Sequence, residues 1–253
     1  MTSETTPRPN RTLLIGLGCA ALGLAAGWAW QQQRFSADPA AALEAGDRKA
    51  IEKVVRDYLL ENPEILPQAM AALQKKQNAS QLAGIRADVE KEWPGQVLGN
   101  PNGKITLVEF TDFACTYCRH SVEDVEALIA EDKDLKVVVK QLPILSPESA
   151  DAAKMGMAAA EQGKYAAFHK AMFSAGRLDP QTIEAAARMA GVDLARAQRV
   201  MADPRFEAEL GRNVEMARQL GFSGTPAWVV GDALISGAVG KEKLAEAIAD
   251  ARS

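Results

Sequence analysis

Apolar positions in the second half of the chain alternate between strand-like and helix-like patterns. Residues 105–110 are rich in β-favouring side chains, and apolar positions at helical spacing lead from there to a second such run at 135–141. The connection is long enough for the two strands to pair in parallel, so the pattern predicts a βαβ unit. The elements predicted after it are an all-helical segment over about 146–220, strands at 227–230 and 233–236, and a final helix at 241–251.

An uncharged apolar run covers residues 13–30. Its 18 residues would extend about 27 Å as a helix, close to the hydrocarbon thickness of a bilayer. Two interpretations stay open, an uncleaved transmembrane anchor, which the length favours, and a cleaved signal segment. In both, Arg8 and Arg11 keep residues 1–12 in the cytoplasm by the positive-inside rule, so the rest of the chain is predicted to be exported. Cys19 is then a membrane-buried thiol.

A helical arm is predicted over residues 47–93, after a linker at 31–46. Apolar residues recur at helical spacing on both sides of Asn62-Pro63, a typical helix start. The arm has too few large side chains to form its own core. Its apolar stripe is therefore covered either by the main domain or by a second copy of the chain, and we favour homo-oligomerisation through the arm.

Composition limits the classes of function. Apolar residues make up 47% and charged residues 25% of the 253 residues, which is typical of a folded protein. The 29 Lys and Arg against 33 Asp and Glu give a net charge of −4, so the chain lacks the basic excess that nucleic-acid binding requires. Three cysteines cannot build a disulfide framework, but two of them stand three positions apart.

These two cysteines belong to the motif Cys115-Thr116-Tyr117-Cys118. The motif opens the helix that follows the first strand, where backbone N–H groups and the helix dipole stabilise a thiolate. Lowering a thiol pKa from about 8.5 to about 5 raises the ionised fraction at pH 7 from about 3% to about 99%. Cys115 is therefore predicted to be the nucleophile, and Cys118, one turn further on, the thiol that resolves a mixed disulfide.

Two other roles of the cysteine pair compete with redox chemistry. A zinc site needs two further ligands. His120 would point elsewhere on its helix and His169 lies in the helical segment, so no metal site is predicted. A permanent structural disulfide would close a ring of only four residues and contribute little loop entropy.

Three features together resemble the DsbA-like branch of the thioredoxin superfamily. They are the cysteine motif directly after its strand, the all-helical insertion between the βαβ and ββα halves, and Gly224-Thr225-Pro226 before the next strand. The resemblance implies an α/β thioredoxin fold over 97–253, with the helical insertion at about 146–220. It also implies a cis proline at Pro226 beside the reactive disulfide, with the Thr225 backbone exposed for pairing with an extended substrate.

The same resemblance suggests a role for Glu109, which matches the position of a buried acid near the active site. Glu109 is a candidate proton shuttle for Cys118, with an ordinary surface carboxylate as the alternative. Phe113, Tyr117 and Trp228 would add apolar surface near the site or belong to the core.

The arm, around Val54–Pro63, also resembles a segment that precedes the catalytic domain in a bacterial group that includes ScsC. Some members of that group oligomerise through the arm and act as disulfide isomerases or reductases. Two departures from the best-known oxidases matter here. Thr116-Tyr117 replaces Pro-His, and Thr225 precedes the proline, as in isomerases. The choice between oxidase and isomerase or reductase therefore stays open.

The expected function is that of an exported thiol–disulfide oxidoreductase of the bacterial periplasm, anchored in the inner membrane by residues 13–30. The resemblance implies no cofactor beyond the Cys115–Cys118 disulfide. Its expected partners are cysteine-containing envelope proteins and a membrane redox partner of the DsbB or DsbD type. The alternatives are a non-enzymatic copper-binding module using the same thiolates, which favour Cu(I), and a membrane-tethered scaffold with a vestigial dithiol.

Overall fold

The computed structural model describes residues 45–252, with side chains from residue 47 onward. The predicted cytoplasmic N-terminus, the anchor or signal segment at 13–30, Cys19 and most of the linker lie outside the described residues. Within the described part, no helix is long and apolar enough to cross a membrane. The described residues divide into two units, with the boundary between Gln68 and Ala69.

The described part of the first unit is helical. It comprises α2 (Ala45–Glu61) and the beginning of α3 (Ile65–Leu82), which continues into the second unit. The two helices separate at the predicted Asn62-Pro63, where the Asn62 side chain donates a hydrogen bond to the Tyr58 carbonyl at 2.9 Å. The large apolar side chains of α2 that remain exposed are Ile51, Val54, Val55, Tyr58 and Leu60.

A five-stranded sheet organises the second unit. The strands are β1 (Val97–Gly99), β2 (Ile105–Thr111), β3 (Leu135–Gln141), β4 (Ala227–Val230) and β5 (Ala233–Ser236). Their order is β1-β3-β2-β4-β5, in which β2 and β3 are parallel and every other pair is antiparallel. A βαβ half is thus joined to a ββα half, and the predicted thioredoxin fold is confirmed.

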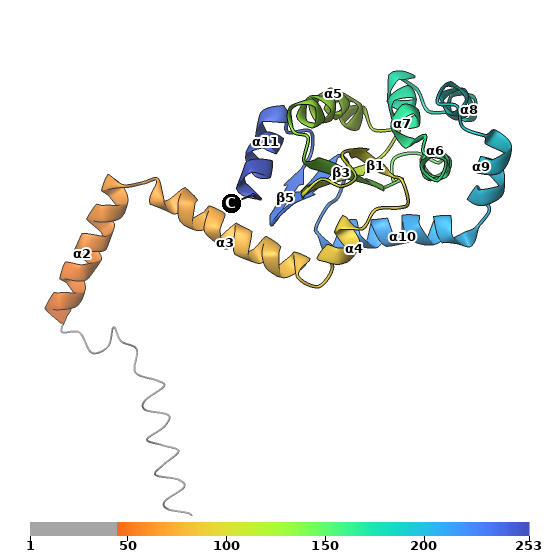
Figure 1. Cartoon of the computed structure of the whole chain (residues 1–253). Helices are drawn as coiled ribbons and strands as arrows, with labels where there is room; N and C mark the ends of the chain where they lie inside the picture. Colours follow the sequence, from red (N-terminus) through yellow and green to blue (C-terminus); the bar gives the residue numbers. More distant parts are fainter. Residues whose placement is uncertain (1–44, 253) are drawn as a thin grey trace, which may run out of the picture. The chain divides into compact units, whose positions relative to one another are not determined.

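Helices cover both faces of this sheet (Figure 1). On one face lie α5 (Thr116–Glu131) and α11 (Lys241–Asp250), and on the other lie α4 (Arg86–Glu90) and the C-terminal half of α10 (Pro204–Gln219). Side chains of successive strand residues point to opposite faces. Leu107 therefore joins the core on the α5 side, whereas Val108 joins a second core on the α4 side.

The insertion between β3 and β4 is helical, as predicted. Its helices are α6 (Ser149–Ala160), α7 (Tyr165–Ser174), α8 (Pro180–Met189), α9 (Leu194–Met201) and α10. Asp179, Asp193 and Asp203 precede α8, α9 and α10, and each accepts a hydrogen bond from a backbone N–H of the first turn. In α8 and α10 the capping aspartate is followed by a proline in the first turn, where a missing N–H costs no helical hydrogen bond.

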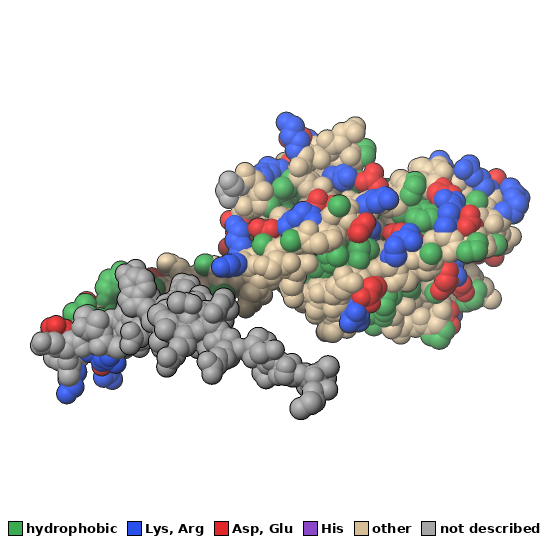
Figure 2. All heavy atoms as spheres, turned by 90° about the horizontal axis from the view of Figure 1, so that it is seen from below, with side chains coloured by type: hydrophobic (Ala, Val, Ile, Leu, Met, Phe, Trp, Pro, Cys, Tyr) green, Lys and Arg blue, Asp and Glu red, His purple; other side chains and the backbone are tan. Residues whose placement is uncertain are grey.

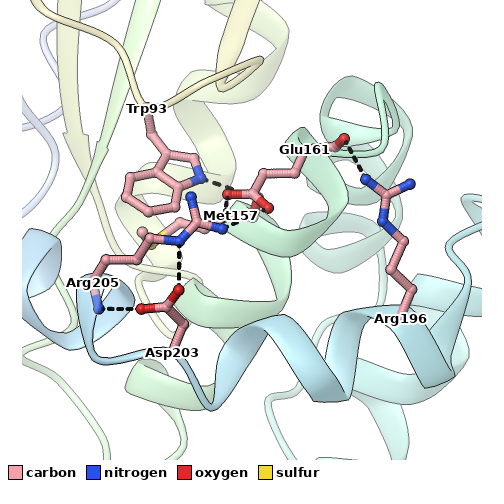
Figure 3. Close-up of polar contacts among 6 residues, drawn as sticks. All are labelled: Trp93, Met157, Glu161, Arg196, Asp203 and Arg205. Atoms are coloured by element: carbon pink, nitrogen blue, oxygen red, sulfur yellow. Dashed lines mark hydrogen bonds and ion pairs between the residues drawn. The ribbon is translucent and has the colours of Figure 1, made fainter.

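The packed domain begins well before Val97. Leu82 and Val89 are buried in the core on the α4 side, and the Trp93 indole donates a hydrogen bond to the Met157 carbonyl of α6. The guanidinium of Arg205 lies 5.1 Å from the centre of the Trp93 ring and forms an ion pair with Glu161 (Figure 3). The C-terminal end of the predicted arm is thus fastened to the insertion. This packing could not be predicted from the sequence, because residues 83–96 are mostly polar and their few apolar residues recur at neither helical nor strand spacing.

Candidate active site

Cys115 is the N-cap residue of α5, directly after the loop that follows β2. Its Sγ accepts a hydrogen bond from the Cys118 backbone N–H at 3.1 Å and donates one to the Thr225 carbonyl at 3.2 Å. Cys115 is 3% exposed, Cys118 is fully buried, and both are free thiols. Both cysteines are therefore buried, Cys118 more completely, and Cys115 precedes the exposed Thr116 and Tyr117.

The surroundings of Cys115 favour its thiolate. Its thiol pKa is lowered from 9.0 to about 6, mainly by the hydrogen bond from the Cys118 thiol, with Thr225 and the backbone N–H groups of Tyr117 and Cys118 adding to the effect. Burial opposes the shift. A thiol with a pKa near 6 is about 90% ionised at pH 7, and the thiolate is the nucleophilic form.

The pKa of the Cys118 thiol is shifted in the opposite direction, upward. Burial raises the pKa of its thiol far above the ordinary value, and Cys115 and Glu109 raise it further. The pair therefore consists of one easily ionised sulfur at the start of α5 and one fully buried sulfur that keeps its proton. A buried thiol of this kind needs a base before it can act as a nucleophile.

Glu109 lies on β2, opposite Val139 of β3 and Trp228 of β4. It is 2% exposed, so the alternative of a surface carboxylate is excluded. Burial raises its pKa from 4.5 to about 8; the nearby Thr111 side chain opposes the shift, and the charge of Cys115 adds to it. The carboxyl group is mostly protonated near neutral pH but can still exchange its proton there.

Thr225 and Pro226 lie directly beside Cys115, as the resemblance implied. The Thr225–Pro226 peptide bond is cis, and the Thr225 carbonyl is the group that accepts the Cys115 thiol hydrogen bond. Pro226 itself is buried and directly precedes β4.

Asp112 is a site residue that the sequence analysis missed. Its carboxylate, 1% exposed, accepts hydrogen bonds from the backbone N–H groups of Ala114, Ile144 and Leu145 at 2.9–3.0 Å. It thus ties the loop before Cys115 to the loop after β3. The sequence does contain a signal for this role, because an Asp that directly follows a strand often accepts hydrogen bonds from the backbone of the next turn.

The aromatic residues around the motif divide into two groups. Phe113 and Trp228 are buried in the core, whereas Tyr117 is 67% exposed beside the reactive cysteine. His169 is buried among aromatic rings, and burial lowers its pKa to about 4. His120 is exposed on α5. In the described part of the chain, no group of three or more His, Cys, Asp and Glu side chains is arranged to hold a metal ion.

This combination of a thioredoxin fold with an ionisable cysteine at a helix start defines the class of thiol–disulfide oxidoreductase-like proteins. The model of the family described as "Thioredoxin" matches residues 91–250, and that described as "Copper resistance protein ScsC N-terminal domain" matches residues 47–79. The chain therefore belongs to the thioredoxin superfamily, as a DsbA- and ScsC-like member.

Solved structures agree with this assignment. A thioredoxin-like oxidoreductase from Silicibacter pomeroyi is 38% identical, with a TM-score of 0.63 over 66% of this chain and 97% of that one. A linker-deletion mutant of ScsC from Proteus mirabilis is 30% identical, with a TM-score of 0.63 over 83% of this chain and 97% of that one. A periplasmic thioredoxin-like protein from Salmonella enterica serovar Typhimurium is 27% identical, with a TM-score of 0.61 over 66% of this chain and 95% of that one.

Curated relatives include much longer proteins. The Na(+)/H(+) antiporter NhaA 1 of Salinispora arenicola is 28% identical over 158 residues, which are 61% of this chain and 24% of the antiporter. The match thus spans about a quarter of the length of this relative and of a second Salinispora antiporter, and 11% of a third antiporter.

Proposed function

We propose that this protein exchanges disulfides with exported proteins through Cys115 and Cys118. The observation that carries the proposal is the environment of the Cys115 sulfur. It sits at the start of α5, bonded to the Cys118 N–H and the Thr225 carbonyl, with its thiol pKa lowered to about 6. A sulfur that lies at a helix start, is ionised at neutral pH and is followed by a second thiol is suited to disulfide exchange.

In the first step, the Cys115 thiolate attacks one sulfur of a substrate disulfide. The Cys115–substrate bond forms, the substrate disulfide breaks, and its second sulfur leaves with the electron pair as a thiolate. Only the ionised form of Cys115 acts, so its lowered pKa sets the lower end of the working pH range.

In the second step, the Cys118 thiol gives its proton to the Glu109 carboxylate and attacks the Cys115 sulfur. The Cys115–Cys118 bond forms and the bond to the substrate breaks, so the substrate leaves reduced and the protein oxidised. The same steps in reverse oxidise a substrate dithiol. Glu109 suits the role of proton acceptor because it is buried behind the pair and its pKa is about 8.

Thr225 and Pro226 are proposed to guide the substrate. The Thr225 carbonyl already lies within hydrogen-bond distance of the Cys115 sulfur. An extended substrate strand that pairs with the Thr225 backbone would bring its own cysteine to that sulfur.

We place the protein in the bacterial periplasm, anchored by residues 13–30, with envelope proteins as substrates and a DsbB- or DsbD-type membrane protein as redox partner. The similarity to a periplasmic relative supports the location. The exposed Thr116-Tyr117 dipeptide lacks the histidine of strong oxidases, which favours isomerase or reductase activity. We also propose self-association through the arm, where the apolar stripe of α2 is exposed.

Substrate trapping tests the function. We expect Cys118→Ser to accumulate mixed disulfides between Cys115 and envelope proteins, visible as reductant-sensitive bands on non-reducing gels, because the resolving thiol is missing. Cys115→Ser is the matched control, since it keeps Cys118 but removes the easily ionised sulfur. If both variants trap the same few species or none, the dithiol has another role, such as copper binding, and the proposal is wrong.

A further inference from the structure

Three loops of the second unit meet at one edge of the sheet. Because β2 and β3 are parallel, their carboxyl ends lie at the same edge, and β4, which is antiparallel to β2, begins there. The loop after β2 leads to Cys115, the loop after β3 contains Ile144 and Leu145, and Thr225 lies just before β4. In open α/β sheets, ligands bind outside the carboxyl ends of the parallel strands. Residues at this edge are therefore placed to contact a substrate.

The loop after β3 crosses this edge from one face of the sheet to the other. Leu142 belongs to the core on the α4 side, whereas Ala152 of α6 belongs to the core on the α5 side. Ile144 and Leu145 lie between these two residues in the chain. The loop therefore carries them over the sheet edge, next to the cysteine motif.

The two carboxylate oxygens of Asp112 bind different loops. Oδ1 accepts a hydrogen bond from the Ala114 N–H at 2.9 Å, and Oδ2 accepts hydrogen bonds from the N–H groups of Ile144 and Leu145 at 2.9 and 3.0 Å. The Asp112 carbonyl also accepts a hydrogen bond from the Cys115 N–H at 2.9 Å. One buried residue thus fixes the backbone of the loop after β3 beside the backbone of the reactive cysteine.

The backbone of this loop is held, but its apolar side chains remain exposed. Ile144 is 44% exposed and Leu145 is 51% exposed. Pro143 and Pro147 restrict the chain on either side of the pair. The loop is therefore preorganised, which lowers the entropic cost of binding to it.

Exposed apolar side chains gather near the cysteine motif. Beyond α3, the large apolar side chains that are exposed in the described part of the chain are Tyr117, Ile144, Leu145, Met189 and Val214. The first three lie in the first turn of α5 and in the loop that Asp112 holds. Apolar surface that stays exposed beside a reactive group is typical of a binding site.

The burial of Cys115 limits the shape of the substrate. Because this residue is only 3% exposed, a substrate cysteine reaches it on a narrow, extended segment of chain. In an extended segment, the residues two positions from the cysteine point to the same side as the cysteine and lie about 6.6 Å from it. Neighbouring strands are about 4.8 Å apart, so such a side chain spans the distance from the loop after β2 to the loop after β3.

We propose that Ile144 and Leu145 determine specificity by binding a large apolar side chain two positions from the substrate cysteine, and that Asp112 is the positioning residue of this surface. The inference rests on the proposed function, because it concerns the substrate of the first exchange step. The substrate class is an extended polypeptide segment with an apolar residue at this spacing from its cysteine.

Two synthetic peptides test the inference, Leu-Gly-Cys-Gly-Leu and Ser-Gly-Cys-Gly-Ser, each with its cysteine in a disulfide with thionitrobenzoate. In the reduced full chain, the Cys115 thiolate attacks the peptide sulfur. The Cys115–peptide bond forms, the peptide–thionitrobenzoate bond breaks, and thionitrobenzoate, the better leaving group, departs as a coloured thiolate. Stopped-flow absorbance gives a second-order rate constant for each peptide. The ratio of the two constants is the readout, so a general change in Cys115 reactivity cancels.

We expect the wild type to react about tenfold faster with the leucine peptide, because partial burial of a leucine side chain contributes a factor of this order. Ile144→Ser combined with Leu145→Ser should bring the ratio to about one, and each single variant should lower it in part. Met189→Ser is the matched control, because it removes an exposed apolar side chain of α8 and should keep the ratio.

Asp112→Asn tests the positioning role. The amide keeps one acceptor oxygen, so it can bond only one of the two loops, and the link between them is lost whichever loop it keeps. The ratio should therefore fall. Added to the double serine variant, Asp112→Asn should leave the ratio at about one, because Asp112 acts through the loop. An unchanged ratio in Asp112→Asn alone would refute this role.

The outcomes separate the inference from the proposed function. Equal rates of the wild type with both peptides, or a tenfold ratio that survives both serine substitutions, would overturn the inference while leaving the exchange function intact. If the wild type releases no thionitrobenzoate from either peptide, or if Cys115→Ser releases it as fast, the proposed function itself is refuted.

Discussion

At the scale of single residues, the site depends on a carboxyl group that is costly to bury. Glu109 lies in the core with no cation beside it in the described part of the chain, and its pKa rises from 4.5 to about 8. Proteins seldom keep such a group without a use for it. Its position behind Cys118 supports the use that we propose, because a proton acceptor must be reachable from the buried thiol.

The buried carboxyl group makes stability depend on pH. Between about pH 4.5 and pH 8 the folded state keeps the Glu109 proton while the unfolded state loses it, so stability falls as pH rises through this window. At about 1.4 kcal/mol for each pH unit, the loss is on the order of 4 kcal/mol. We therefore expect Glu109→Gln to gain this amount relative to the wild type between about pH 4 and about pH 8.

Urea unfolding of both reduced proteins at the two pH values measures this difference. Taking the difference between wild type and variant cancels the contributions of groups that the substitution does not affect. A difference that stays constant with pH would show that Glu109 ionises normally, as an exposed carboxylate does.

Residue roles could be predicted from the sequence only where a motif marks them. Cys115 and Cys118 stand out by spacing, and Pro226 and Glu109 by resemblance. Asp112 does not stand out, because its role depends on contacts with the loop after β3, about 30 positions away, at Ile144 and Leu145. No local pattern encodes such a contact.

At the scale of elements, β2 to β5 could be predicted because each is a run of β-favouring residues between turn signals. Three of the four have the expected bounds, and β2 extends one residue further, to Thr111. The short β1 and α4 escaped prediction, since three and five residues are too few to show a period. They are held by tertiary contacts, β1 by pairing with β3 and α4 by the buried Val89.

The exposed apolar side chains of α2 allow a test of self-association. If its stripe mediates self-association, Val54→Asp should lower the mass in solution to that of a single chain. Burying a valine contributes about 1.5 kcal/mol per chain, and an unpaired carboxylate in its place opposes association. Light scattering over a range of concentrations measures the mass.

Gln68→Asp is the control for this substitution, because it adds the same charge at an exposed position of α3 outside the apolar stripe. A wild-type protein that is monomeric at every concentration, or an oligomer that Val54→Asp leaves intact, would contradict association through α2.

At the scale of the whole molecule, surface charge agrees with a protein substrate. Basic and acidic side chains are interspersed over the face seen in Figure 2, and the full chain has a net charge of −4. A surface of this kind offers no continuous basic track for nucleic acid. We propose that a protein substrate is recognised by the apolar and backbone groups around the cysteine pair.

The fold brings together groups from distant parts of the chain around one sulfur atom. The motif at the start of α5 supplies Cys115 and Cys118, and the segment before β4 supplies Thr225. The proposed function depends on the ionisation of Cys115, because disulfide exchange near neutral pH requires its thiolate.

The most direct measurement is the rate at which iodoacetamide alkylates Cys115 in the reduced full-length protein, followed by mass spectrometry as a function of pH. We predict a rate that rises with a midpoint near pH 6, the lowered pKa of this thiol. A midpoint near 9, the ordinary pKa of a thiol, would contradict the account.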